Sequence, residues 1–282
     1  MAGALWCLRL NMAEIHLISI GLGLFIGMVL ALTGAGGTLL SIPLLVFALD
    51  LNIQQAAPIA LVSIFAASSL GALNGLSKGL VRYKAALVIA GFGIALAPIG
   101  VLVAHQLSHA LLSLLLVSVL LFVAVHMWRN TLAVDHTDLP PASCAINPVT
   151  STLFWTAACT KRLIFTGSFS GFLSGLLGVG GGFVIVPSLH KVSNLSHASI
   201  VATSLAAVAL VSAASLASHW QRADILWPIA IPFALSCIVS MLLLGLFQGK
   251  IPRQCSQKGF AILCVMAALY MGTQAIVAGL SH

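Results

Sequence analysis

The sequence predicts an all-α integral membrane protein, a polytopic helix bundle made of two internal repeats. Three observations predict this class. Of the 282 residues, 60% are hydrophobic and only 6% are charged, whereas soluble domains carry about 25% charged residues. The apolar residues form runs, most of them close to the roughly 20 residues that cross a bilayer as a helix. A glycine-rich element occurs twice, once in each half of the chain.

Ten apolar runs are expected to form the helices. Strands of an outer-membrane barrel would alternate polar and apolar residues, and these runs do not alternate. The chain therefore divides into a first transmembrane repeat over 14–130, a polar connector over 131–161 and a second repeat over 162–280. The runs are Ile15–Thr33, Thr38–Leu49, Gln54–Leu76, Ala85–His105, Ala110–Trp128, Leu163–Leu177, Phe183–His190, Ala198–His219, Ile225–Phe247 and Phe260–Ala278.

The glycine-rich element sets the register of the duplication. Glycines and a following proline match between the halves at an offset of 144 residues. Further on, Ile59–Ser63 resembles Ile200–Ser204 at an offset of 141, which predicts that one connecting loop is three residues shorter in the second half. The residues matched at 144 are Gly27, Gly34, Gly36, Gly37 and Pro43 with Gly171, Gly178, Gly180, Gly181 and Pro187.

The first segment of each half, broken by these glycines, decides the topology. If it crosses the membrane once, the halves are parallel and the 12 Lys and Arg residues divide 8 to 4 between the two sides. If its net crossing is zero, the halves are inverted and the same 12 residues divide 10 to 2. Because basic residues concentrate on the cytoplasmic side, we predict inverted repeats, a cytoplasmic connector and both termini outside the cytoplasm.

The apolar run after the second glycine-rich element is too short to span the membrane. Phe183–His190 has far fewer than the roughly 20 residues of a transmembrane helix. We therefore expect a re-entrant half-helix there, with a full crossing as the alternative.

The two glycine-rich elements are the strongest candidates for a solute site. Within a bilayer, non-helical backbone is tolerated only where it is buried in protein or lines a cavity. A helix that begins after Gly37 or Gly182 would present free N–H groups and the positive end of its dipole to an anion. Broken helices at matching positions of two halves also mark the binding sites of transporters. The alternative is that glycines only permit close helix packing, which we prefer for Gly23, Gly27, Gly171 and Gly175.

Polar residues inside the spans could complete the hydrogen-bond shell of a solute. The alternative is that they join helices, with bonds worth about 1 kcal/mol or less. Ser63 and Ser204 are the preferred pair because the sequence match places them equivalently. The predicted substrate-binding residues are Gly34, Ala35, Gly36, Gly37, Thr38, Ser63, Asn74, Gly178, Val179, Gly180, Gly181, Gly182, Thr203 and Ser204.

The rest of the composition limits the chemistry. All five acidic residues lie outside the middle of the runs, so a buried carboxylate relay is not expected and an anion suits the site better than a metal cation. Phosphate-loop, HExxH and GxSxG motifs are missing, as is any Cys or His spacing typical of a metal site. We predict no enzyme activity, metal or cofactor. The net charge of +7 is explained by membrane orientation rather than by nucleic-acid binding.

The duplicated Gly-x-Gly-Gly-x5-Pro element, followed in each half by a serine-bearing run and a basic loop, resembles the TauE/SafE sulfite exporter family. The resemblance extends from about Ile15 to Ala278. The first half departs from the fuller pattern, with Thr38 where the second has Gly182 and Ala35 where it has Val179.

This resemblance implies a secondary transporter or facilitator in a bacterial cytoplasmic (inner) membrane. Its solute would be a small anion: sulfite, an organosulfonate, or a related sulfur-containing or carboxylate compound. The partners are then the anion and the lipid bilayer, and a homo-oligomer is compatible with the sequence. The alternatives are an anion channel, an intramembrane enzyme or a membrane assembly factor; the last two would need a reactive pair within the bilayer, which the spacing does not provide.

Overall fold

The computed structural model describes residues 12–34, 37–132, 157–193, 195–220, 225–245 and 253–280. The described residues form ten helices, one for each predicted apolar run. They are α2 (Met12–Thr33), α3 (Gly37–Leu49), α4 (Ile53–Ser77), α5 (Tyr83–Gln106), α6 (His109–Leu132), α7 (Ala157–Leu177), α8 (Gly182–Val192), α9 (His197–Trp220), α10 (Trp227–Gly245) and α11 (Arg253–Leu280).

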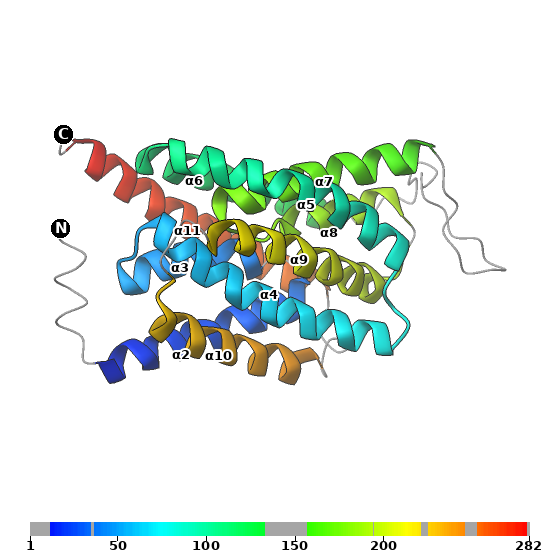
Figure 1. The fold of residues 1–282 in the computed structure, drawn as a ribbon, viewed down its shortest axis with the longest axis horizontal. Helices are drawn as coiled ribbons and strands as arrows, with labels where there is room; N and C mark the ends of the chain where they lie inside the picture. The colour runs from blue at the N-terminus through cyan, green and yellow to red at the C-terminus, as the bar shows by residue number, and fades with distance from the viewer. Residues whose placement is uncertain are drawn as a thin grey trace.

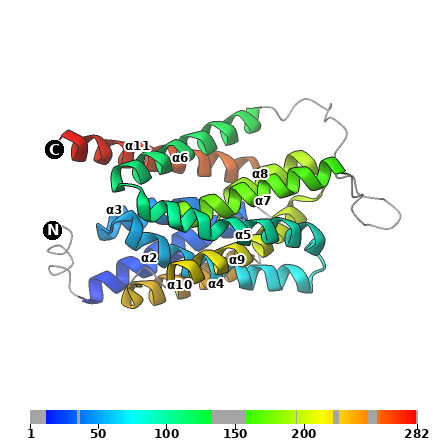
Figure 2. The same cartoon turned by 45° about the horizontal axis from the view of Figure 1, so that its top comes forward.

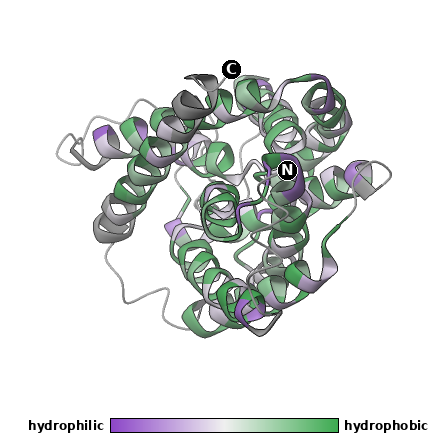
Figure 3. Ribbon diagram, turned by 90° about the vertical axis from the view of Figure 1, so that its left-hand side faces the viewer, coloured by the Kyte–Doolittle hydropathy of each residue, from purple (hydrophilic) through white to green (hydrophobic). Residues whose placement is uncertain are grey.

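The helical class is confirmed, and six helices are long and apolar enough to cross a membrane: α2, α4, α5, α6, α9 and α10. Large apolar side chains face outward, with Leu17, Phe122 and Phe165 each more than 70% exposed. Seen from one end of the bundle, most of the helix ribbons carry the colour of hydrophobic residues (Figure 3). Exposing these apolar side chains to water would be unfavourable, whereas a bilayer would cover them.

Two helices are too short to cross the membrane alone. The helices α3 and α8 contain 13 and 11 residues. At 1.5 Å per residue they are about 20 Å and about 16 Å long, against a hydrocarbon core of about 30 Å. Each follows one of the glycine-rich breaks.

The centre of the bundle is formed by α4 and α9, which lie side by side and run in opposite directions (Figures 1 and 2). The most extensive contacts in the described chain join α5 to α7 and α2 to α10, and α6 packs along α11. The half-helices α3 and α8 contact α4 and α9 respectively, and they also touch each other. Helix α2 begins and α11 ends at the same end of the bundle (Figure 1).

Glycines allow the two closest helix pairs to form. A Cβ atom at Gly171 would collide with the backbone of Gly93, and one at Gly27 with the carbonyl group of Cys237. Without side chains at these positions, α7 and α5, and likewise α2 and α10, bring their backbones into contact. The packing interpretation of Gly23, Gly27, Gly171 and Gly175 is confirmed.

The helices of the second half follow those of the first at a constant distance along the chain. Helices α9, α10 and α11 begin 144 residues after α4, α5 and α6. The predicted three-residue shortening is therefore wrong: residues 50–52 connect α3 to α4, and 193–196 connect α8 to α9. In this register Ser63 corresponds to Ala207 and Ser68 to Ser212, so the helix starts do not support the predicted equivalence of Ser63 and Ser204.

Candidate functional site

The chain between α7 and α8 is shaped by glycine. Gly178, Gly180 and Gly181 have φ angles of 70°, 69° and 64°, a left-handed region that is costly for residues with a Cβ atom. In the first half Gly34 has a φ of 79°, and Ala35 and Gly36 lie outside the described residues. The predicted breaks in the helices are therefore real, and their glycines determine where the chain turns.

Both breaks lie against the central helices. A Cβ atom at Gly180 would be 3.0 Å from Ile64, near the middle of α4, and 3.5 Å from Val208, near the middle of α9. Gly178 packs on Ala57 of α4, and Gly34 packs on Val201 of α9. Each break thus contacts the central helix of the other half. Gly34, Gly37, Thr38 and residues 178–182 are all buried.

The start of α8 is a cluster of unpaired backbone donors. Its N-cap, Gly181, has no side chain to bind the first turn, and its carbonyl oxygen accepts a hydrogen bond from Ser170 Oγ at 3.0 Å. The amides of Gly180, Gly181, Gly182 and Phe183 find no acceptor within the described chain. An unsatisfied buried donor costs about 1–3 kcal/mol, and an anion at a helix N-terminus removes that cost.

The polar side chains that were predicted to bind the solute have other roles or positions in the structure. Ser63 and Ser204 donate to carbonyl groups of their own helices, at 3.0 and 2.8 Å. Thr203 Oγ1 accepts a hydrogen bond from the Arg82 amide at 3.0 Å, which fastens α9 to the turn between α4 and α5. Asn74 is half-buried and lines a small cavity between the end of α4 and the start of α9. The structure therefore brings the glycine-rich elements together but gives these four side chains other positions.

One buried hydroxyl near the break was absent from the predicted set. Ser212 of α9 is fully buried, lies beside Gly180, and finds no hydrogen-bond partner among the residues that the structure describes. Its sequence surroundings resemble those of any serine in an apolar helix. Only the 144-residue register, which aligns it with Ser68, sets it apart.

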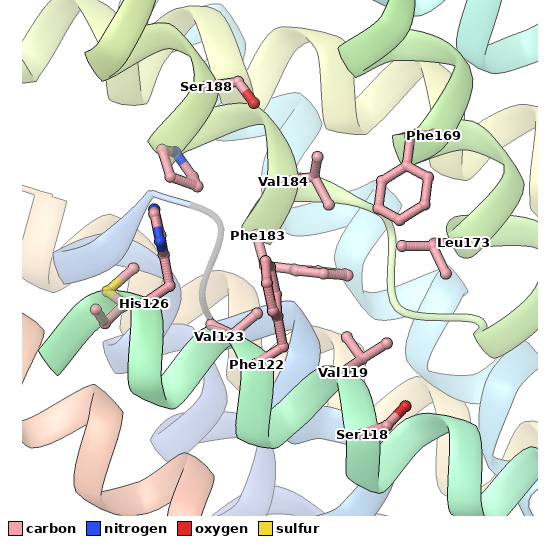
Figure 4. A pocket seen from close by; sticks show the side chains of 12 residues that line it. Ser118, Val119, Phe122, Val123, His126, Phe169, Leu173, Phe183, Val184 and Ser188 are labelled. Carbon is pink, nitrogen blue, oxygen red and sulfur yellow. The ribbon is translucent and has the colours of Figure 1, made fainter. Parts of the chain in front are cut away.

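An apolar groove of about 560 Å³ adjoins the start of α8. Phe122 and Val123 of α6 form one wall, and Leu173 of α7 with Phe183 and Val184 of α8 form the other (Figure 4). Phe183 and Val184 follow directly after Gly182, so the groove leads to the residues that carry the unpaired amides.

The 144-residue register pairs this groove with a face of the other half where helices are packed together. There α11 packs directly on α2 and α3, and the rings of Phe47 and Tyr270 meet edge to face with centroids 4.7 Å apart. Tyr270 lies 144 residues after His126, which lines the open groove. The face formed by α6, α7 and α8 thus has a groove, and helix packing and an aromatic contact occupy the face formed by α11, α2 and α3.

Two broken helices that meet at the centre of a polytopic bundle are typical of membrane transporters. The chain belongs to the family described as Sulfite exporter TauE/SafE, which matches residues 19–271. It is accordingly a multi-pass membrane transporter and not an enzyme, and the predicted family is confirmed.

Three relatives share the name probable membrane transporter protein. One from Xylella fastidiosa strain 9a5c is 25% identical over 260 residues, covering 90% of this chain and 94% of the relative. One from strain Temecula1 is 24% identical over 261 residues, with the same coverage. One from Haemophilus influenzae is 33% identical over 115 residues, covering 38% of this chain and 44% of the relative. No solved structure matches the chain significantly.

Proposed function

We propose that the protein is a secondary transporter or facilitator that carries a small anion, such as sulfite, an organosulfonate or a carboxylate, across the bacterial cytoplasmic membrane. The observation that carries this proposal is the start of α8, where amides of four buried residues lack acceptors beside the central helices. Backbone donors at a helix N-terminus favour negative charge. The name of the family adds support for sulfite as the first anion to test.

The two repeats are proposed to be inverted. Packing contacts support this arrangement, because they recur with the halves exchanged: Gly27 meets Cys237, and Gly171 meets Gly93, each partner displaced by 144 residues. Among the described residues each half contributes five helices, and an odd number of helices reverses the direction of the second half. The opposite course of α4 and α9 agrees with this (Figure 2).

The connector is proposed to be cytoplasmic, with both termini on the other side. Lys78, Arg82, Arg129 and Lys161 lie where α4 and α6 end and where α5 and α7 begin, which supports a cytoplasmic location for that end. One observation opposes it: Cys159 is disulfide-bonded, and disulfides are rare in the cytosol. Reporter fusions at His282 and within the connector should report opposite sides, with the connector inside. Both on one side would overturn the inversion; a connector outside would reverse the orientation.

The difference between the two related faces supports alternating access by rocking of one helix group against the other. A channel conducts while both sides of its pathway are open at once, whereas here a groove lies beside α8 and aromatic rings are packed together beside α3. In a transporter the two faces would exchange these states.

The proposed function is tested with the purified protein in sealed lipid vesicles. Radiolabelled sulfite, taurine, acetate and a labelled cation are offered separately, and uptake is compared with protein-free vesicles. We expect saturable flux of at least one of the three anionic or sulfonate-bearing solutes and none of the cation. Flux of the cation alone, or of none of the solutes, would overturn the proposal.

A further inference from the structure

Most buried hydroxyl groups in these helices form a hydrogen bond, many of them within their own helix. Serine and threonine side chains commonly donate to the carbonyl group three or four residues earlier in a helix, and most described ones do so. On α9, Ser199 and Ser215 bond instead to Leu80 and Ser174, whereas the hydroxyl of Ser212 is fully buried and has no partner in the described chain. The hydroxyls that bond within their own helices include those of Ser19, Ser63, Ser68, Thr166, Ser204 and Ser218.

The unpartnered hydroxyl points at the break before α8. Ser212 Oγ is 3.0 Å from the position that a Cβ atom at Gly180 would occupy. Gly180 is also the first of the four residues, Gly180 to Phe183, whose amide groups lack acceptors. The next nearest atoms to that position belong to the side chains of Ile64 and Val208, which are apolar and offer no acceptor. The side-chain donor of Ser212 therefore lies beside the first of these backbone donors in the buried interior of the bundle.

We infer that Ser212 donates a hydrogen bond to the transported oxyanion when the anion is bound at the N-terminus of α8. This inference rests on the proposed function and adds a specificity-determining side chain to it. An oxyanion has several acceptor oxygens, so one ion can satisfy both the hydroxyl and the amides. Hydrogen bonds to a charged partner are stronger than those between neutral groups.

The two halves differ in the hydrogen bonding of the serine at this position. We therefore assign the anion to the second half. Ser68 corresponds to Ser212 in the 144-residue register and is equally buried, but its hydroxyl donates to the carbonyl oxygen of Ile64. It is therefore already satisfied without a ligand. Ser68 provides a matched control at the related position.

The test compares Ser212→Ala with Ser68→Ala in the same vesicles, with sulfite as the probe. We expect Ser212→Ala to raise the KM for sulfite about tenfold, a change of about 1.4 kcal/mol, with the maximal rate within about twofold of the parent. Ser68→Ala should leave the KM unchanged. An unchanged KM in Ser212→Ala, or an equal rise in both variants, would overturn the inference.

Thermal unfolding in detergent separates a ligand-binding role from a structural one. Without anion, Ser212→Ala should have a Tm equal to or above that of the parent, because the substitution removes an unsatisfied buried donor. Added sulfite should raise the Tm of the parent and of Ser68→Ala, and raise that of Ser212→Ala less. A lower Tm of Ser212→Ala without anion would assign the hydroxyl a structural role. Failure of the parent to transport any anion would instead overturn the proposed function.

Discussion

The glycines before α8 are required for two reasons: their backbone lies in the left-handed region, and a side chain would collide with neighbouring atoms. Gly181 has a φ of 64°, and a Cβ atom there would collide with the hydroxyl and carbonyl groups of Ser170. Conformation alone costs a non-glycine residue about 1–3 kcal/mol. A glycine is therefore required where the chain turns between α7 and α8. The closely spaced glycines in the sequence already indicate the position of this turn.

We predict that Gly181→Ala abolishes anion flux and lowers the free energy of unfolding by about 2 kcal/mol or more. The expected cause is displacement of the turn that presents the amides of α8. Flux in vesicles and thermal unfolding provide the two measurements. Gly21→Ala is the control, because Gly21 is helical and exposed and has no atom within 4 Å of its added Cβ. Similar behaviour of the two variants would contradict the prediction.

At the scale of elements, close backbone contact joins helices from different halves. We predict that Gly171→Val separates α7 from α5 and reduces stability by about 3 kcal/mol, at the upper end of the range for overpacking. Gly27→Val should act similarly on α2 and α10, because its neighbour is the backbone of Cys237. Gly91→Val, with open space around it, is the control. Equal yields and unfolding temperatures for all three variants would show that the tight contacts carry no stability.

Ten helices could be predicted because each is an apolar run bounded by polar residues or glycine. The prediction missed the first turns of α7 and α11, which begin at Ala157 and Arg253, because those turns contain polar residues. The glycine-rich elements were predictable for a physical reason, since few other residues can reverse the chain there. Ser212 was not, because its significance depends on the side-chain rotamer and on the neighbouring turn.

At the scale of the whole molecule, the groove beside α8 and the packed rings of Phe47 and Tyr270 predict state-dependent cross-linking. Cysteines replacing Phe47 and Tyr270 should be joined rapidly by a short thiol-reactive cross-linker, because these rings are in contact. Cysteines replacing His126 and Ser188, which line the groove, should react slowly at rest and faster during transport. Either cross-link should stop flux. Rapid reaction of both pairs with flux retained would contradict an exchange of states.

A split chain should test how the halves depend on each other. We predict that fragments 1–145 and 146–282 are each degraded when expressed alone and recover flux when expressed together. The reason is that α2 finds its most extensive contacts on α10 and α7 finds its own on α5. Quantitative immunoblots and vesicle flux measure the outcome. A stable, monomeric first fragment would contradict the prediction.

These crossed contacts also bear on ancestry. A gene encoding a single half would have made a protein whose first helix lacked its covering surface. Under the inversion proposed above, the nearest matching surface would have been on another copy inserted in the membrane the opposite way up. The contacts between Gly27 and Cys237 and between Gly171 and Gly93 would then be the fused remains of a homodimer of dual orientation. Fusion would have released the two copies from identity, so that Ser68 and Ser212 could diverge in their roles.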